Sequence, residues 1–162
     1  MADAPLAVAV AALIKDGRIL LIKRAKGSYA GMWGLPGGKI EGAEHASEAA
    51  VREVLEESGI ASEVKRFMGV VSEHLIEGGR VLNHFLLFIF ELDPKATNVT
   101  AGAEGRIEWI GLKGIEDMKK EIIPSDFAVI EGMLGGEGAG YYDCVLEKSG
   151  DDYLVRRFER LR

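Results

Sequence analysis

The stretch GGKIEGAEHASEAAVREVLEESGI, residues 37–60, decides the fold of this chain. It opens on the glycine pair Gly37-Gly38, continues through Glu44 into an alanine-rich segment, and closes with Gly59. Alanine favours helix formation, and a glycine just after the last turn is the typical left-handed residue that ends a helix. We therefore predict a helix that begins soon after Glu44 and ends at Gly59.

Three glutamates of this segment lie on one side of the expected helix. At about 100° per residue, Glu53, Glu56 and Glu57 fall within an arc of roughly a quarter turn, so their carboxylates are expected to converge on one point. Like charges at this spacing repel one another, so stability alone does not account for them. Clustered carboxylate oxygens are suitable ligands for Mg²⁺ or Mn²⁺. The opposite side carries an apolar stripe, of the kind that a surface helix buries against a sheet, made of Ala50, Val51, Val54 and Leu55.

A solvated acidic face is the alternative interpretation of a glutamate-rich helix, and the spacing of the surrounding residues argues against it. The spacing is Gly38, five residues, Glu44, seven residues, Arg52-Glu53-Val54, one residue, Glu56-Glu57, one residue, and Gly59-Ile60. This pattern resembles the signature box of the Nudix (MutT-like) hydrolases, with every defining position filled. The preceding WGLPG, residues 33–37, is similar to the usual lead-in of that family.

The resemblance implies the Nudix fold, an α/β/α sandwich in which a mixed sheet lies between helices. Residue patterns also predict strands on both sides of the box helix and another helix late in the chain, which indicates α/β organisation. A chain of 162 residues suits one domain. We therefore expect residues 1–162 to form a single Nudix hydrolase domain.

Family members hydrolyse a nucleoside diphosphate linked to another moiety, and the resemblance implies which residues bind the metal. Glu53, Glu56 and Glu57 are the expected carboxylate ligands, and a glycine carbonyl, here that of Gly37, is a further ligand. Glu104 lies in a later acidic segment that precedes a tryptophan-containing strand. The resemblance makes Glu104 a further metal ligand or the general base, with Glu53 the other candidate for the base. The expected cofactor is Mg²⁺ or Mn²⁺.

Arg52 is expected to assist catalysis beside these carboxylates without binding the metal. A guanidinium cannot ligate Mg²⁺, but it can orient a carboxylate through a bidentate hydrogen bond. Glu44 and Glu56 are the candidate partners. Gly38, Glu44 and Gly59 are the remaining structural positions of the box.

The flanking segments predict a hairpin at each end of the chain. The apolar segments 6–15 and 18–23 are separated by Asp16-Gly17, which suits a type I′ turn. Residues 141–147 and 153–159 alternate around a turn and predict a C-terminal β-hairpin. Its edges could extend the sheet or form a dimer interface.

Further elements are expected in the middle and later parts of the chain. Residues 62–72 predict a strand that can continue to 77, and residues 81–92 form a long apolar run typical of a strand covered on both faces. Residues 115–121 predict a short helix. A second helix begins at Pro124-Ser125, where Ser125 is a suitable N-cap.

Five residues outside the acidic helix are candidates for substrate contacts, and each has a structural alternative. Arg24 could contact phosphate or ribose, or simply aid solubility. Trp33 could stack on a base or anchor packing. Asn83 and His84 are a polar pair in an otherwise apolar strand and could contact a base or sugar. Asp126, at a helix start, could bind a base edge or complement the helix dipole.

The expected substrate is a nucleoside triphosphate, modified nucleotides included, which would be converted to the monophosphate and pyrophosphate. ADP-ribose or a nucleotide sugar is the alternative, but the proline that marks many ADP-ribose hydrolases is absent, with Leu75 and Ile76 near its place. The tyrosine associated with diadenosine polyphosphate hydrolases is also missing near Glu77. An alternative of another class is a catalytically silent, nucleotide-binding Nudix-like sensor, although such domains usually lose box carboxylates.

Composition narrows the expected partners and location. The net charge is −6, with no block of Lys or Arg that would indicate binding to nucleic acid or to a membrane surface. Residues 6–14 are too short an apolar run for a membrane span and lack the flanks of a signal peptide, so a cytoplasmic location is expected. The single Cys144 excludes an intrachain disulfide. The expected partner is a small nucleotide substrate, and a homodimer is left open.

Overall fold

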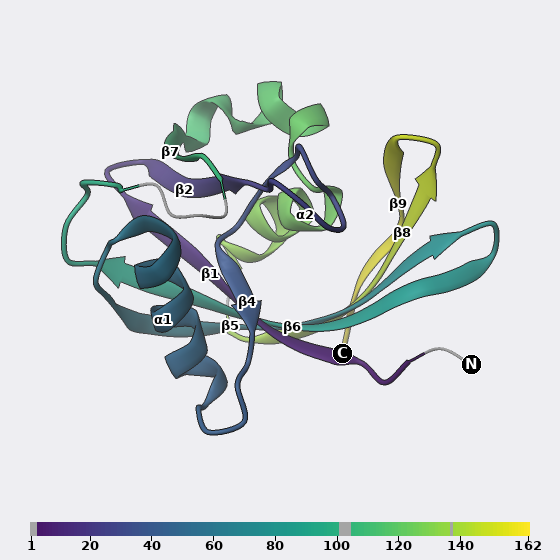
Figure 1. Ribbon diagram of the computed structural model, residues 1–162, viewed down its shortest axis with the longest axis horizontal. Coiled ribbons are helices and arrows are strands. Elements are labelled where there is room, and N and C mark those ends of the chain that lie inside the picture. Colours follow the sequence, from purple (N-terminus) through teal and green to yellow (C-terminus); the bar gives the residue numbers. More distant parts are fainter. Residues whose placement is uncertain (1–2, 101–104, 137) are drawn as a thin grey trace.

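The computed structural model describes residues 3–100, 105–136 and 138–162. A mixed sheet lies at its centre, with one helix on each face and a 3₁₀ helix at one end (Figure 1). The elements in chain order are β1 (Leu6–Lys15), β2 (Arg18–Lys23), β3 (Trp33–Gly34), β4 (Gly37–Lys39), α1 (Ala46–Ser58), β5 (Ser62–Glu77), β6 (Arg80–Pro94), β7 (Ile107–Gly111), the 3₁₀ helix η1 (Leu112–Glu121), α2 (Pro124–Met133), β8 (Gly140–Ser149) and β9 (Asp152–Leu161).

The sheet has the strand order β3-β2-β1-β6-β5-β8-β9, while β4 pairs with β1 and β7 pairs with β2. The pairs β1–β6 and β5–β8 are parallel, and the other pairs are antiparallel. Both predicted hairpins are present as β1–β2 and β8–β9. Asp16 and Gly17 both have positive φ, as a type I′ turn requires.

Helix α1 covers one face of the sheet and buries its small residues there. Ala49, Ala50 and Val54 are fully buried against alternate residues of β1, including Ala9 and Ala11. Small side chains on both elements let the helix approach the sheet closely. The helix ends at Gly59, whose φ of 76° is left-handed and whose N–H donates to the carbonyl of Leu55, as predicted.

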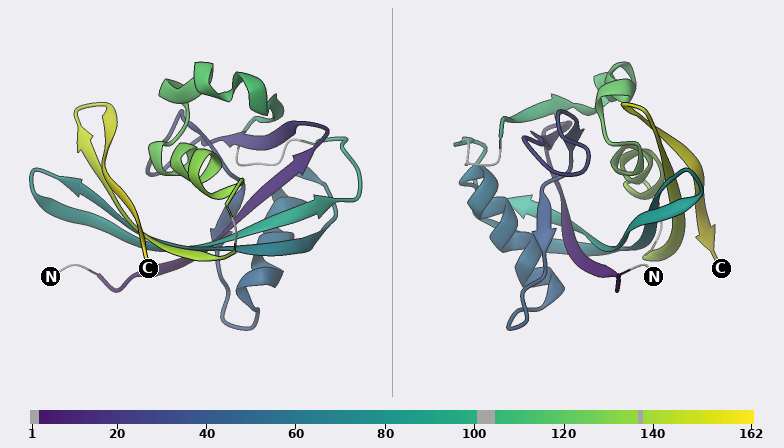
Figure 2. Two further views of the ribbon diagram at one scale, coloured as in Figure 1. Left: turned by 180° about the vertical axis from the view of Figure 1, so that it is seen from behind. Right: turned by 45° about the vertical axis from the view of Figure 1, so that its right-hand side comes forward.

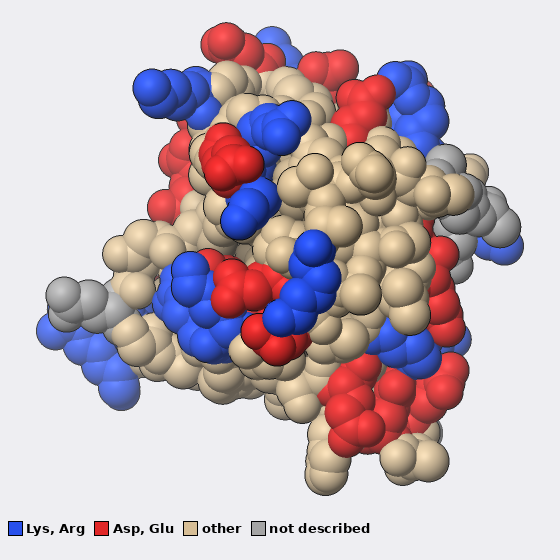
Figure 3. All heavy atoms as spheres, turned by 90° about the vertical axis from the view of Figure 1, so that its left-hand side faces the viewer, with Lys and Arg blue, Asp and Glu red and all other residues tan. Residues whose placement is uncertain are grey.

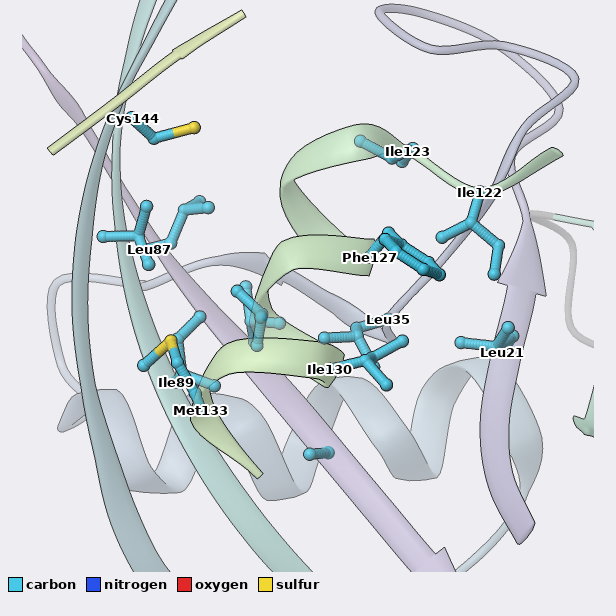
Figure 4. Packing of buried hydrophobic residues seen from close by; sticks show 14 of the residues in the cluster. Leu21, Leu35, Leu87, Ile89, Ile122, Ile123, Phe127, Ile130, Met133 and Cys144 are labelled. Atoms are coloured by element: carbon cyan, nitrogen blue, oxygen red, sulfur yellow. The ribbon is translucent and has the colours of Figure 1, made fainter. Parts of the chain in front are cut away.

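Helix α2 covers the opposite face and completes the predicted α/β/α sandwich. Figure 4 shows Phe127, Ile130 and Met133 of α2 packed toward Leu87 and Ile89 of β6. Because side chains alternate along a strand, residues 87 and 89 face α2, and the intervening Phe88 packs on the α1 side. Among the described helices, none combines the length and apolar character needed to span a membrane.

The β5–β6 and β8–β9 hairpins extend past both helices at the same end of the molecule (Figure 2). Residues 81–92 were predicted to form a strand covered on both faces, and this is wrong for its first half. Val81 and Leu82 are exposed, and buried residues begin only at Leu87. The projecting half has no helix to cover it, whereas the predicted continuation of β5 to Glu77 is confirmed.

Three local expectations also change. Ser125 is not the N-cap of α2, because Pro124 occupies the first helical turn, Ile123 is the cap residue, and Ser125 is buried inside the helix. The helix expected over 115–121 is 3₁₀ and begins earlier, at Leu112. On α1, Leu55 is 50% exposed, whereas Glu57 is only 4% exposed, so the apolar stripe is shifted relative to the prediction.

Gly69 allows β5 and β8 to approach closely and provides a test of this arrangement. Its φ is 140°, and a Cβ at this position would collide with the carbonyl oxygen of Gly140 on β8. We expect Gly69→Ala to lower the free energy of unfolding by about 2–4 kcal/mol, because backbone must move to accommodate the methyl group.

Urea denaturation would measure this loss. The matched control is Gly111→Ala, where a Cβ would meet no atom within 4 Å and where the change should stay within about 0.5 kcal/mol. Equal stability of Gly69→Ala and the wild type would contradict the described pairing of β5 and β8.

Candidate active site

Strand β4 and helix α1 bring two predicted metal-binding glutamates against a glycine backbone. Gly38 has no side chain, and a Cβ there would overlap the Glu53 carboxylate, whose farthest atom would lie 2.7 Å away. The backbone N–H of Gly37 donates to Oε1 of Glu57 at 3.0 Å. Gly38 is therefore required because the Glu53 carboxylate occupies the space that a side chain there would fill, and Gly37 is required because a Cβ there would collide with the carbonyl oxygen of Ala9 on β1.

Arg52 holds the carboxylates of the box together. It binds Glu44 through both ends of its guanidinium, from Nε to Oε2 at 2.9 Å and from Nη2 to Oε1 at 2.7 Å. Its Nη1 donates to Glu53 Oε1 at 2.9 Å and to Glu56 Oε2 at 3.1 Å, and Nη2 also donates to the carbonyl of Lys39. Both candidate partners of Arg52, Glu44 and Glu56, are thus in contact with it.

This arrangement keeps the box charged. The hydrogen bonds from Arg52 are the main cause that lowers the pKa of Glu44 to about 2, with a smaller contribution from the backbone N–H of Glu41. The same carboxylates raise the pKa of Arg52. Arg52 and Glu44 therefore remain an ion pair across the neutral pH range, and the orientation of Glu53 is fixed by a permanent charge.

The oxygen ligands suit a hard divalent cation, although the three carboxylates do not all meet at one point. Glu53 and Glu57 both lie against the backbone of β4, and Glu56 turns toward Arg52, which also holds Glu53. Across the described residues, no set of three or more His, Cys, Asp or Glu side chains is gathered closely enough to enclose a metal ion. Carboxylate oxygens beside a glycine backbone are nevertheless the ligand type that Mg²⁺ and Mn²⁺ prefer. Glu104 lies outside the described residues.

Negative charge is concentrated around the box. Figure 3 shows acidic side chains gathered at the lower right of one face, on the side of the molecule that carries α1. The exposed carboxylates of this region include Glu41, Glu48 and Glu56. A phosphate substrate would be repelled by this surface unless a cation neutralised part of the charge.

A cavity of about 520 Å³ opens beside the box. Its lining includes Gly38 and Glu53 near the box, and Glu73 and Asp126 on β5 and α2. Strands β1 and β6 lie between β4 and β5 in the sheet, so the cavity floor crosses three strand spacings, or roughly 14 Å. One end of the cavity is therefore lined by residues of the box, and the other end is lined by Glu73 and Asp126, which lie far from the box.

Four buried side chains form this other end, which we call the acidic pocket: Tyr29, Glu73, Ser125 and Asp126. The Tyr29 hydroxyl donates to Glu73 Oε2, and the backbone N–H of Leu35 donates to Asp126 Oδ2, each at 3.0 Å. Among the described residues, no cation forms a direct ion pair with Glu73 or Asp126, and Arg24, which lines the same cavity, is the cation whose charge acts on Asp126. Two buried carboxyl groups thus lie close together with only this partial compensation of their charge.

Burial changes the protonation of the acidic pocket. It raises the pKa of Glu73 above the ordinary value, against the effect of the Ser125 and Tyr29 hydroxyls. Burial also raises the pKa of Asp126 to about 7, opposed mainly by the hydrogen bond from Leu35 and reinforced by the charge of Glu73. The pocket can therefore hold a proton near neutral pH, so that a carboxyl group there can donate as well as accept a hydrogen bond.

The predicted substrate contacts fall into two groups. Arg24 and Asp126 line the cavity. Trp33 is 5% exposed and packs in the core, with Lys23 and Arg106 over its ring, away from the cavity lining. Asn83 and His84 lie on the projecting half of β6, where His84 Nε2 is 3.0 Å from Ser72 Oγ, and neither residue lines the cavity.

Sequence reasoning missed Tyr29 and Glu73 as cavity residues, whereas Phe85 belongs to the segment 83–85 that it expected to contact the substrate. One signal for Glu73 was available, because it takes the inward position between Val71 and Leu75 in an alternating strand. A charged residue at such a position demands a partner or a ligand. Tyr29 gave no comparable signal, since it lies in a glycine-rich loop whose path depends on the rest of the fold.

The fold and the site define a hydrolase class in which an arginine-bound set of glutamates lies beside a glycine strand. Residues 5–131 match the family model of the NUDIX domain, so this chain belongs to the Nudix hydrolase family. Members of this family generally use divalent metal ions. The predicted family and fold are therefore confirmed.

Individual relatives agree with this assignment. The chain is 39% identical over 101 residues to an ADP-ribose pyrophosphatase of Methanocaldococcus jannaschii, covering 62% of this chain and 58% of that protein. It is 31% identical over 127 residues to the CTP pyrophosphohydrolase of Escherichia coli, covering 77% and 89% of the two proteins. A MutT protein structure from Bacillus halodurans superimposes with a TM-score of 0.75 at 22% identity, over 96% of this chain and 97% of that one.

The contact between Gly38 and Glu53 predicts an activity defect without unfolding. In Gly38→Ala the new methyl group would displace only the end of the flexible Glu53 side chain, so the melting temperature should change little. Metal-dependent turnover should fall by about 10–100-fold because the carboxylate loses its position. Gly42→Ala, where a Cβ meets no atom within 4 Å, is the control and should retain wild-type turnover. Wild-type activity of Gly38→Ala would contradict this role of Glu53.

The raised pKa of Asp126 predicts a pH-dependent stability difference from Asp126→Asn. In the folded protein the Asp126 carboxyl group keeps its proton up to about pH 7, whereas in the unfolded chain it releases the proton near its ordinary pKa of 3.8. The stabilisation from the protonated carboxyl is therefore full below about pH 4 and is lost as pH rises through 7. Urea denaturation should show wild-type stability falling relative to the variant by up to about 1.4 kcal/mol per pH unit across this window. A pH-independent difference would show that Asp126 is ionised throughout.

Proposed function

We propose that this protein hydrolyses a nucleoside triphosphate to the nucleoside monophosphate and pyrophosphate, with Mg²⁺ or Mn²⁺ as cofactor. The observation that carries the proposal is the single cavity that joins Glu53 and Gly38 of the box to the polar pocket of Glu73 and Asp126. Its volume of about 520 Å³ lies in the range of small-molecule sites. Such a cavity suits a ligand with phosphates at one end and a hydrogen-bonding base at the other.

At the box end, the chain supplies ligands and a positioned base. Glu53, Glu56, Glu57 and the carbonyl of Gly37 would hold the cation, which when bound neutralises phosphate oxygens and lowers the pKa of coordinated water. Arg52 holds Oε1 of Glu53, so this carboxylate is oriented before substrate arrives. We assign Glu53 as the general base, with Glu104 as the alternative.

At the far end, the cavity walls suit the nucleoside. Phe85 and Leu87 of β6 contribute apolar surface, against which a base ring can pack. Arg24 also lines the cavity, and its Nε donates to the carbonyl of Ser28. We assign Arg24 to contact with phosphate or ribose and Asp126 to contact with the base.

ADP-ribose is the second candidate substrate. The 39% identity to the archaeal ADP-ribose pyrophosphatase favours it, whereas the greater coverage of the bacterial CTP pyrophosphohydrolase favours a triphosphate. Incubation with Mg²⁺ and a panel of nucleoside triphosphates, ADP-ribose, nucleotide sugars and dinucleoside polyphosphates separates the candidates. We expect monophosphate and pyrophosphate from a triphosphate. Release of AMP from ADP-ribose alone would favour the second candidate, and tight binding without turnover would favour a silent sensor.

We further propose that residues 1–162 act as one catalytic domain, because its early and late elements share one site. Gly37 and Glu53 come from β4 and α1, and Asp126 comes from α2. The proposed ligand is a small nucleotide, and a homodimer formed through the edge strand β9 remains a proposal.

The role of Glu57 is testable by a conservative substitution. In Glu57→Gln, the amide oxygen can still accept the hydrogen bond from Gly37, so the fold should persist while the charge is lost. We expect metal-dependent triphosphate hydrolysis to fall by at least about 100-fold. The melting temperature and turnover of the purified variant would be measured together.

The matched control is Glu48→Gln on the same helix. Glu48 accepts from the backbone N–H of His45 as part of a capping box, and Gln retains this function. Wild-type turnover is expected for the control. Loss of activity through unfolding of Glu57→Gln, or unchanged turnover, would remove Glu57 from the proposed ligand set.

A further inference from the structure

A short buried connection between β3 and β4 leads into the box. It consists of Leu35 and Pro36, both buried, and it ends at Gly37, the first residue of β4. The N–H of Gly37 donates to Glu57 Oε1 at 3.0 Å, and its carbonyl is assigned above to the cation. The placement of this backbone at the box therefore depends on how the connection before it is held.

Strand β1 and helix α2 hold the connection by one hydrogen bond each. The carbonyl of Pro36 accepts from the N–H of Ala11 on β1 at 2.9 Å. The N–H of Leu35 donates to Oδ2 of Asp126 on α2 at 3.0 Å. Leu35 lies between two strands and belongs to neither, so a side chain has to satisfy its buried N–H. Asp126 is the residue that does so.

The start of α2 also packs directly against the backbone of β3. A Cβ on Gly34 would lie 2.6 Å from Oδ2 of Asp126 and 2.8 Å from Cδ1 of Ile123. The N–H of Ile123 donates to the carbonyl of Trp33 at 2.8 Å. A glycine at position 34 thus leaves room for the carboxyl group of Asp126 to reach the next residue along the chain.

A simpler role for Asp126 does not account for these contacts. An acidic residue in the first turn of a helix often serves only to complement the helix dipole. That role suits an exposed carboxylate, whereas Asp126 is 8% exposed and its burial carries a desolvation cost. Its hydrogen bond goes to a residue 91 positions earlier in the chain. The carboxyl group therefore connects α2 to the segment before the box.

We propose that Asp126 is a positioning residue for the box, which fixes Gly37 and its partner Glu57 by holding the N–H of Leu35. This proposal rests on the proposed function, because that function assigns the Gly37 carbonyl and Glu57 to the cation. The connection is short, and the residue between Leu35 and Gly37 is a proline, whose ring fixes φ. A displacement of Leu35 is therefore passed on to Gly37. This role is additional to the base contact assigned to Asp126 in the cavity.

The test compares Asp126→Ala with Asp126→Asn. Asparagine keeps an oxygen that can accept from Leu35, and alanine has none. In the metal-free protein, amide hydrogen exchange of Gly37, measured by NMR, should be at least about 10-fold faster in Asp126→Ala than in the wild type. Mn²⁺ affinity, measured by electron paramagnetic resonance, should be about 10-fold weaker in Asp126→Ala. Both quantities should stay within about twofold of the wild type in Asp126→Asn.

Leu146→Ala controls for a general loss of stability. Leu146 is fully buried on β8, which β6 and β5 separate from β1. The cavity left by this substitution should lower the melting temperature, while Gly37 exchange and Mn²⁺ affinity should match those of the wild type. If Asp126→Ala does not fold, Gly34→Ala replaces it, because its methyl group would push the Asp126 carboxylate away from Leu35. The same weakening of Mn²⁺ binding is expected.

Three results would overturn the proposal. They are unchanged exchange at Gly37 in Asp126→Ala, wild-type Mn²⁺ affinity of the folded Asp126→Ala, and equal weakening in Asp126→Asn, which would point to charge rather than to the hydrogen bond with Leu35. If the wild type itself binds no Mn²⁺, the proposed function fails, and the exchange of Gly37 alone decides whether Asp126 positions this backbone.

Discussion

The site depends on the ion pair between Arg52 and Glu44. Glu44 lies in the loop before α1, and Arg52 lies on the helix, so their two-point hydrogen bond fixes the helix to the segment that follows β4. The other donor of Arg52 then binds Glu53 and Glu56. Because exposed single ion pairs contribute little, it is this shared, bidentate geometry that gives the interaction its value. The Arg52 side chain thus contacts three carboxylates and one backbone carbonyl, those of Glu44, Glu53, Glu56 and Lys39.

The sheet connects the box to the cavity, because its two faces pack against different helices. Alternating residues of β1 serve two cores, with Ala9 and Ala11 under α1 and Val8 and Val10 facing the cavity. The α1 face therefore positions the glutamates, and the α2 face forms the walls of the cavity. The parallel pairing of β1 with β6 places Phe85 and Leu87 next to β1, which brings the acidic pocket within reach of a ligand held at the box.

Much of the fold and of the box could be predicted from the sequence, because the contacts within the box join residues that are close together in the chain. The glycine at 59, the two-residue turn at Asp16-Gly17 and the partners of Arg52 all depend on residues a few positions apart. The acidic pocket could not be predicted, since Tyr29, Glu73 and Asp126 meet only through pairing of distant strands and packing of α2. The expectation of three converging carboxylates is met only in part, because Glu53 and Glu57 lie together against β4 whereas Glu56 turns to Arg52. Helical angles alone do not show that Glu57 is drawn to the Gly37 backbone and Glu56 to Arg52.

We propose that Arg52 orients the carboxylates that would bind the cation. Electron paramagnetic resonance of Mn²⁺ with the wild type and with Arg52→Lys tests this role, because lysine keeps the charge but cannot form the bidentate contact. We expect Arg52→Lys to stay folded and to bind Mn²⁺ about 10–100-fold more weakly. Mn²⁺ affinity equal to that of the wild type would contradict the claim.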